Sequence, residues 1–213
     1  TIPDAEDCAI DAEGTRFHYL PKSGDAIVVQ GTSRCHYRFG TVFADTTGAA
    51  LRIKPTENMP SLMSIVQFTG LIGNPSERKG IGLCGDSTVE NVCTMRFEGT
   101  DIRDFDTGVF VPDARPSRPD KPGSGKTDTN WYWFSYIRMC NTCIWEQHNG
   151  IDDGVWFVNV DASIPNAVAV RTAATYGKWF IIMGSMGWFV RPHDEKNKTK
   201  TVILDPGAQY NVM

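Results

Sequence analysis

Acidic side chains in the middle of the chain are the residues best suited to chemistry. Eight of them form two groups along the sequence: Glu98, Asp101, Asp104 and Asp106, followed by Glu146, Asp152, Asp153 and Asp161. Two carboxyl groups can cleave a glycosidic bond when one donates a proton and the other acts as nucleophile or base. The alternative is that these residues only form turns, in which Asp is one of the commonest residues.

Aromatic residues form a second candidate feature in the same part of the chain. Residues 131–134 read Trp-Tyr-Trp-Phe. Because side chains alternate across a strand, Trp131 and Trp133 share one face, and Tyr132 and Phe134 share the other. Outward-facing Trp side chains offer large rigid rings, which suit flat partners such as sugar rings. The candidate ligand-binding residues are Trp131, Trp133, Trp145 and Trp156. The alternative is that these rings pack internally or between subunits.

A repeat positions both groups. Ile102–Val111 aligns with Ile137–Glu146, with Ile, Arg and Thr in identical places. Small residues that precede short apolar runs recur at positions 24, 48, 80, 108, 143, 167 and 187. An aromatic residue precedes most of these anchors, which predicts a stacked column of Phe39, Phe68, Phe97, Phe134, Phe157 and Phe180. Such periodicity is typical of a solenoid whose units share one core.

The repeated units have the pattern of strands. They contain short runs of β-branched and aromatic residues between Gly, Asn, Asp and Pro, and no helical stripe of apolar residues. The sequence therefore predicts an all-β fold, a single-stranded parallel β-helix (β-solenoid) of about seven rungs. Acids in one outward column would lie about 5 Å apart on adjacent rungs and about 9.5 Å apart two rungs away. These separations match retaining and inverting glycosidases.

The predicted domain organisation has two parts. Residues 1–23 lack the repeat and are expected to cap the solenoid, whose strand edges would otherwise be unpaired. Residues 24–213 form the solenoid, with a long loop at 112–130 that contains four prolines. A loop of this length is uncommon unless it is functional or disordered. It could cover a groove, contact a neighbouring subunit or lie in solvent.

Composition excludes several classes of protein. A net charge of −4 with scattered basic residues gives no electrostatic footprint for nucleic acid. No apolar run approaches the roughly 20 residues that a membrane-spanning helix needs, so no membrane insertion is expected. The six cysteines are compatible with free thiols or with bridges. Cys140 and Cys143 form a lone CxxC without the second pair that a zinc site needs, so no metal or cofactor is predicted.

The region of about residues 24–204 resembles the right-handed parallel β-helix of the pectate-lyase-like superfamily, which includes polygalacturonases, polysaccharide lyases and bacteriophage tailspikes. The resemblance lies in an apolar patch with Phe, an Ile, and then Gly followed by three apolar residues. Asn149–Val155 is similar to the paired-Asp motif of polygalacturonases. It implies that Asp152 and Asp153 supply the acid and help to activate water. The Asn-Thr-Asp and Gly-His-Gly motifs that accompany this pair in the family are missing.

Two functional hypotheses follow. The first is a tailspike-like or tail-fibre-like surface protein, extracellular or on a virion, that presents loops and aromatic residues to a polysaccharide or cell-surface glycan. The tailspike resemblance implies a homotrimer. The second is a polysaccharide hydrolase or lyase whose acid pair includes Asp152 and Asp153, with Asp104 or Asp106 as further candidates. Two carboxyl groups that converge in a groove, one with a raised pKa, would favour the enzyme.

Overall fold

The strands are distributed over three sheets. The computed structural model describes residues 1–112, 127–147, 155–162, 164–172, 179–182, 200–204 and 211–212. The five-stranded sheet contains β1 (Ala5–Glu6), β4 (Thr32–Ser33), β7 (Ser61–Leu62), β10 (Val92–Cys93) and β13 (Thr127–Asp128). The eight-stranded sheet contains β2 (Ala9–Tyr19), β5 (His36–Ala44), β8 (Ile65–Ile72), β11 (Arg96–Arg103), β14 (Trp131–Arg138), β16 (Val155–Asp161), β18 (Trp179–Ile182) and β20 (Asn211–Val212). The seven-stranded sheet contains β3 (Ile27–Val29), β6 (Ala49–Ile53), β9 (Ile81–Gly85), β12 (Thr107–Val111), β15 (Thr142–Glu146), β17 (Val168–Thr172) and β19 (Lys200–Leu204).

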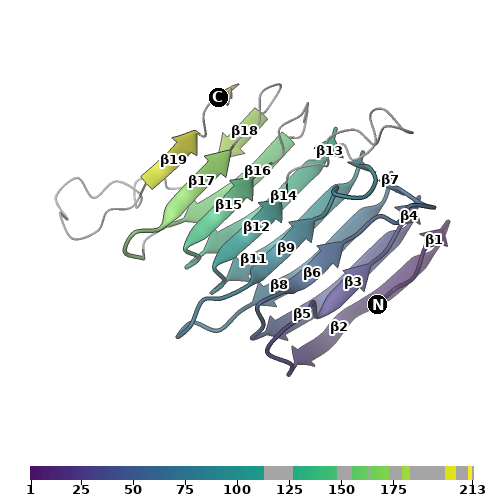
Figure 1. The fold of residues 1–213 in the computed structure, drawn as a ribbon, viewed down its shortest axis with the longest axis horizontal. Coiled ribbons are helices and arrows are strands. Elements are labelled where there is room, and N and C mark those ends of the chain that lie inside the picture. Colours follow the sequence, from purple (N-terminus) through teal and green to yellow (C-terminus); the bar gives the residue numbers. More distant parts are fainter. Residues whose placement is uncertain are drawn as a thin grey trace.

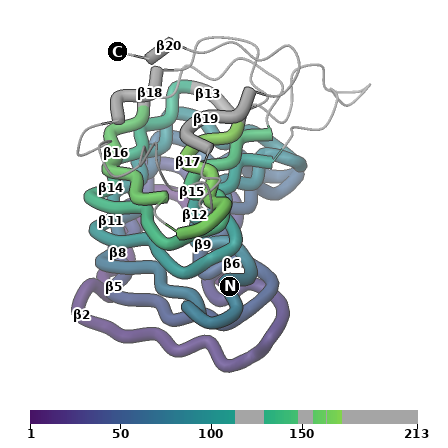
Figure 2. The backbone as a smooth tube through the Cα atoms, turned by 90° about the vertical axis from the view of Figure 1, so that its left-hand side faces the viewer, coloured from purple at the N-terminus to yellow at the C-terminus, as the bar shows by residue number. Residues whose placement is uncertain are grey.

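Each of the first five passages of the chain adds one strand to each sheet, and the described strands that follow belong to the eight- and seven-stranded sheets. The chain runs through β4, β5 and β6 and then returns to place β7, β8 and β9 beside them in the same order. All described strand pairs are parallel. Figure 2 shows the resulting units stacked from the N-terminal end upward, and Figure 1 shows the strands side by side. The all-β prediction is confirmed for the described residues, and the arrangement is compatible with a β-solenoid. None of these residues forms a helix that could span a membrane.

The register of the strands confirms one alignment and corrects another. Ile102 pairs with Ile137 and Thr107 with Thr142, as the sequence predicts. The pairing of Ala49 with Ile81 puts the preceding glycines, Gly48 and Gly80, in one column, whereas the small residues at 108 and 143 belong to a column two positions later. Gly48 and Gly80 lie in the bends that directly precede β6 and β9. Gly80 has a φ of +69°, and a Cβ on it would lie 2.2 Å from the Thr46 carbonyl oxygen.

The core between the sheets contains two inward columns from the eight-stranded sheet. One consists of Tyr37, Val66, Phe97, Tyr132 and Trp156. The other consists of Phe39, Phe68, Gly99, Phe134 and Val158. The predicted single Phe column is therefore wrong. Alternation along a strand permits inward residues at several positions on each long strand, and successive units place their aromatic rings at different ones.

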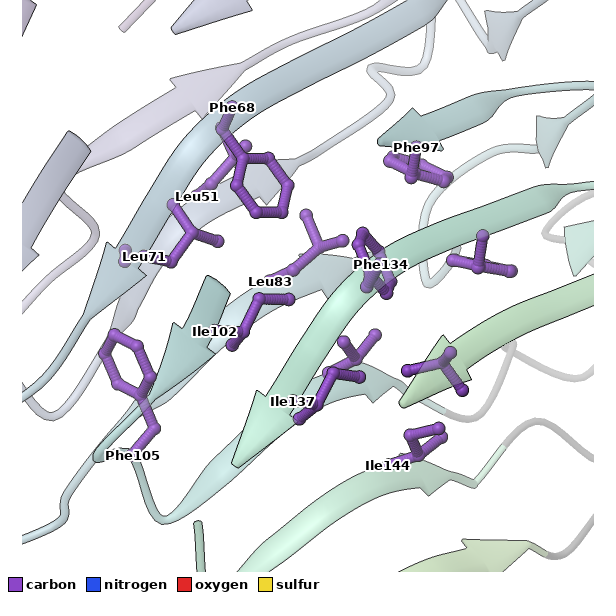
Figure 3. Packing of buried hydrophobic residues seen from close by; sticks show 14 of the residues in the cluster. Leu51, Phe68, Leu71, Leu83, Phe97, Ile102, Phe105, Phe134, Ile137 and Ile144 are labelled. Atoms are coloured by element: carbon purple, nitrogen blue, oxygen red, sulfur yellow. The ribbon is translucent and has the colours of Figure 1, made fainter. Parts of the chain in front are cut away.

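Gly99 explains how the second column is filled. A Cβ at Gly99 would lie 2.1 Å from a ring carbon of Phe68, so the Phe68 ring occupies the space of the missing side chain. The rings of Phe68 and Phe134, two strands apart, consequently approach to 5.8 Å between centroids. Figure 3 shows both rings in the core beside Leu83, Ile102 and Ile137. The missing side chain at Gly99 in the middle unit thus lets rings from the two flanking units meet.

The N-terminal segment lies at the edge of two sheets. Residues 1–23 contain β1 and β2, which pair in parallel with β4 and β5 and form the end strands of two sheets. The segment lies at an edge, as a cap would, but it follows the repeat. Its repeat is hidden because β2 alternates polar outward residues with small or partly buried ones such as Ile10 and Ala12. Most of the predicted loop at 112–130 lies outside the described residues.

A recurrent bend leads into β5, β8, β11 and β14. Arg34, Met63, Thr94 and Thr129 each adopt a positive φ, between +47° and +55°, directly after a strand of the five-stranded sheet. Positive φ is uncommon for residues other than glycine. The same bend recurs in successive units, and it starts their long strands in register.

Candidate functional site

A groove crosses the outer face of the eight-stranded sheet. It has a volume of about 400 Å³ and passes over β2, β5, β8, β11 and β14. Its lining side chains with polar groups come from five successive units of the chain: Glu13, Arg38, Gln67, Thr69, Arg96, Glu98, Thr100 and Trp133.

The parallel register creates this arrangement. Arg38 pairs with Gln67, Gln67 with Glu98, and Glu98 with Trp133, so these residues form one outward column. Neighbouring strands lie about 4.8 Å apart, so successive side chains of the column lie side by side. The inward neighbours Phe39, Phe68 and Phe134 fix the backbone beneath the column. The core therefore positions the groove.

Hydrogen bonds order the middle of the groove. The Gln67 side chain accepts a hydrogen bond from His36 Nε2 at 2.7 Å and donates one from its amide nitrogen to Glu98. Glu98 also forms an ion pair with Arg96. The Gln67 amide is hydrogen-bonded through both its oxygen and its nitrogen, so it is fixed in place. It therefore gives the Glu98 carboxylate a defined orientation on the groove floor.

A second ion-pair group lies at the N-terminal end of the groove. Arg38 donates to Asp11 at 2.9 Å and also pairs with Glu13. The basic residues that line the groove are thus matched by carboxylates on the same surface. Such a surface presents both donors and acceptors without a large excess of either charge. It suits a ligand with many hydroxyl groups, because a hydroxyl can both donate and accept.

Aromatic rings close the other end of the groove. The side chains of Trp131 and Trp133 are 49% and 53% exposed, whereas Tyr132 and Phe134 are buried. The predicted division of these four residues between two faces is confirmed. The Trp133 ring stacks on Phe157 of the next strand, with 5.1 Å between centroids. Trp133 therefore presents a supported aromatic face beside the polar floor.

The other two predicted tryptophans do not join this surface. Trp156 is fully buried, and its ring stacks on Tyr132 with 3.8 Å between centroids. Its place in the outward wall is corrected, because its register partner is the inward Tyr132 rather than Trp133. Trp145 lies on the seven-stranded sheet, where its ring packs against Phe110 at 5.1 Å and under the Arg171 guanidinium at 4.8 Å.

The predicted catalytic acids that the structure describes, Asp104 and Asp106, do not line the groove. Asp152 and Asp153 lie outside the described residues. Asp104 and Asp106 lie in the bend between β11 and β12, and neither lines the groove. Asp106 is exposed and accepts a hydrogen bond from Asn141 at 2.9 Å.

Asp104 nevertheless has an altered acidity. Burial raises its pKa, although Arg103, 3.7 Å away, partly offsets this effect. Asp101, on β11, also approaches Arg103 and binds Arg138 with both carboxylate oxygens at 2.9 Å. These two acids meet around arginines at the end of β11, outside the groove lining.

The cysteines carry no metal site in the described part of the chain, where no three His, Cys, Asp or Glu side chains gather to hold an ion. All six cysteines are free. Cys140 and Cys143 are buried, and burial raises the pKa of Cys140 to about 12. This CxxC is therefore part of the core.

Comparisons with known proteins found no match among family models, curated proteins or solved structures. Functional inference consequently depends on the groove itself. Of the residues that line the groove, the sequence alone points to Trp133 and Glu98 but not to Arg38, Gln67 or Arg96. Arg38, Gln67 and Glu98 are each the third residue of a long strand, and this shared position becomes visible only once the register is known.

Proposed function

We propose that this protein is a glycan-binding surface protein built on a single-stranded right-handed parallel β-helix, and that the groove is its binding site. The observation that carries the proposal is the half-exposed Trp133 ring at the end of an ordered polar floor formed by Gln67, Glu98 and Arg96. A sugar ring offers an apolar face for the indole and hydroxyl groups for the polar side chains. The rigid core beneath would limit the ordering cost of binding.

The tailspike resemblance supports a position outside the cell or on a virion. Tailspikes of this kind are commonly homotrimers, and the exposed Trp131, Trp133 and Tyr136 are the sort of residues that a subunit interface would also cover. The two roles predict different behaviour. In an interface role these rings are hidden in the trimer, whereas in a glycan role they stay accessible in whatever oligomer forms.

The experiment is a binding screen of the purified protein against a broad panel of polysaccharides, followed by titration of the best ligand. Trp133→Ala should weaken binding at least about tenfold, because the stacking ring is lost. Tyr136→Ala is the matched control, since Tyr136 lies on the same strand with 49% exposure but does not line the groove. Equal affinity in wild type and Trp133→Ala would contradict the proposal.

A polysaccharide hydrolase or lyase is the second candidate. The raised pKa of Asp104 favours it, because a general acid needs a carboxyl group whose pKa lies above the ordinary range. New reducing ends or unsaturated uronides, formed by the wild type and lost in Asp152→Ala, Asp153→Ala or Asp104→Ala, would establish it. Binding without product from any substrate would leave the binding protein as the correct description.

A further inference from the structure

Cys8 and Cys35 form an unusually close pair of thiols. Their Sγ atoms are 3.3 Å apart, although 27 positions separate them in the chain. Cys8 follows β1 and Cys35 follows β4, two strands that pair in parallel. The six cysteines of the chain are all free in the structure. Cys8 belongs to the first unit of the fold and Cys35 to the second.

The backbone holds the two residues directly opposite each other. On one side, the Asp7 nitrogen donates to the Ser33 carbonyl at 3.0 Å. On the other side, the His36 nitrogen donates to the Cys8 carbonyl at 2.9 Å. Adjacent strands lie about 4.8 Å apart, and disulfide-bonded cysteines have Cα atoms about 4.4 to 6.8 Å apart. A disulfide can therefore form here with little movement of the backbone.

We propose that Cys8 and Cys35 are an oxidative cross-linking site, which a low-molecular-weight disulfide such as oxidised glutathione converts to an intramolecular disulfide. This inference does not depend on the proposed glycan binding. Its consequence is a covalent bond between two neighbouring units in oxidising surroundings.

The exposures of the two thiols set the order of the steps. Cys8 is partly exposed, whereas Cys35 is only 2% exposed. The Cys8 thiolate attacks the glutathione disulfide, forms a mixed disulfide and releases one glutathione thiolate. The Cys35 thiolate then attacks Cys8 Sγ and releases the second. Two electrons pass from the cysteines to the glutathione disulfide, and the two cysteine protons pass to solvent or to the released thiolates.

The surroundings favour Cys35 as the resolving thiolate. Burial raises the pKa of Cys35, but hydrogen bonds from Thr32, the Cys8 backbone and Tyr37 outweigh burial and lower it. Burial and the hydrogen bond to Cys35 raise the pKa of Cys8. The Thr32 and Tyr37 hydroxyls are themselves 2.9 Å apart, so they form a small polar group beside the pair.

The test is to incubate the folded protein with oxidised glutathione and then count its thiols after denaturation. We expect the count to fall from six to four, with a mass loss of two hydrogen atoms and a non-reduced peptide map that joins the Cys8 and Cys35 peptides. The melting temperature should rise by about 5 °C or more and return after reduction.

Two kinds of variant make the result specific. Cys8→Ser and Cys35→Ser should each keep all five remaining thiols free of intramolecular bonds. Cys93→Ser removes a partly exposed thiol from β10, two units away from β4, and should form the cross-link as the wild type does. A thiol count that stays at six, a stable glutathione adduct as sole product, or a map that joins other cysteines would overturn the proposal.

Discussion

The two faces of β14 carry similar residues but lie in different surroundings. Tyr132 and Phe134 point into the core and are no more than 2% exposed, whereas Trp131 and Trp133 point outward and are about half exposed. The inward rings contact rings from neighbouring units, including Phe68, Phe97 and Trp156. Along the outer column that contains Trp133, the earlier units instead carry Arg38, Gln67 and Glu98. Position in the strand, rather than residue type, therefore decides whether a ring is buried in the core or exposed on the outer face.

The largest expected effect comes from the inward face. Phe134→Ala removes a buried ring that meets Phe68 across Gly99, and it should destabilise the fold by about 3 to 5 kcal/mol. Chemical denaturation followed by circular dichroism measures this loss. A loss below about 1 kcal/mol would mean that the ring does not support the core as described.

Gly99→Ala tests the same contact from the other side. Its Cβ would overlap the Phe68 ring, so the variant should lose about 1 to 3 kcal/mol of stability. Phe68→Leu in the same chain should recover part of this loss because the shorter side chain leaves room. If the two substitutions are additive in a double-mutant cycle, the steric explanation is wrong.

Two acids at the end of β11 should respond in opposite directions. Asp101→Asn breaks the two-oxygen contact with Arg138 and should cost about 1 kcal/mol. Asp104→Asn should instead stabilise the fold at pH 7 by about 0.5 kcal/mol, because burial disfavours the ionised form.

The pH dependence of the Asp104 effect has a defined sign. A raised pKa means that the folded state binds its proton more tightly than the unfolded state does, so the ionised group destabilises the fold above that pKa. The gain from Asp104→Asn should therefore be present at pH 7 and disappear as the pH falls to the ordinary Asp pKa of 3.8. Thermal melts of both chains across this range measure it, and a gain that grows toward low pH would contradict the assignment.

The smallest expected change in stability comes from the outward face. Trp133→Ala should alter the free energy of unfolding by no more than about 0.5 kcal/mol, since the ring is half exposed. Chemical denaturation of Trp133→Ala and Phe134→Ala under the same conditions compares the free energies of unfolding of the two variants directly. A large loss would show that Trp133 and Phe157 form a structural contact and would weaken the distinction between the two faces.

Much of the fold could be predicted from the sequence, because identical residues in Ile102–Val111 and Ile137–Glu146 reveal the register of two units. The outward placement of Trp131 and Trp133 followed from alternation alone. The Phe column could not be predicted, since Phe97 and Phe134 lie at inward positions two residues apart and a glycine compensates for the difference. Trp156 was misplaced for a related reason: its face depends on its pairing with Tyr132.

The groove was the least predictable feature. Arg38, Gln67 and Glu98 lie about 30 positions apart in the chain, and no local motif connects them. Polar residues in the outer positions of strands are also common on any soluble surface. Only the parallel register of the strands places these three side chains in one column that ends at Trp133.

Oxidative footprinting of the protein with and without its best polysaccharide ligand tests the central claim most directly. Hydroxyl radicals modify exposed tryptophans, so bound glycan should protect Trp131 and Trp133 and leave Trp145, on another sheet, unchanged. Protection of Trp133 would place the ligand in the groove. Unchanged modification of Trp131 and Trp133 in a saturated complex would contradict a glycan site on this face.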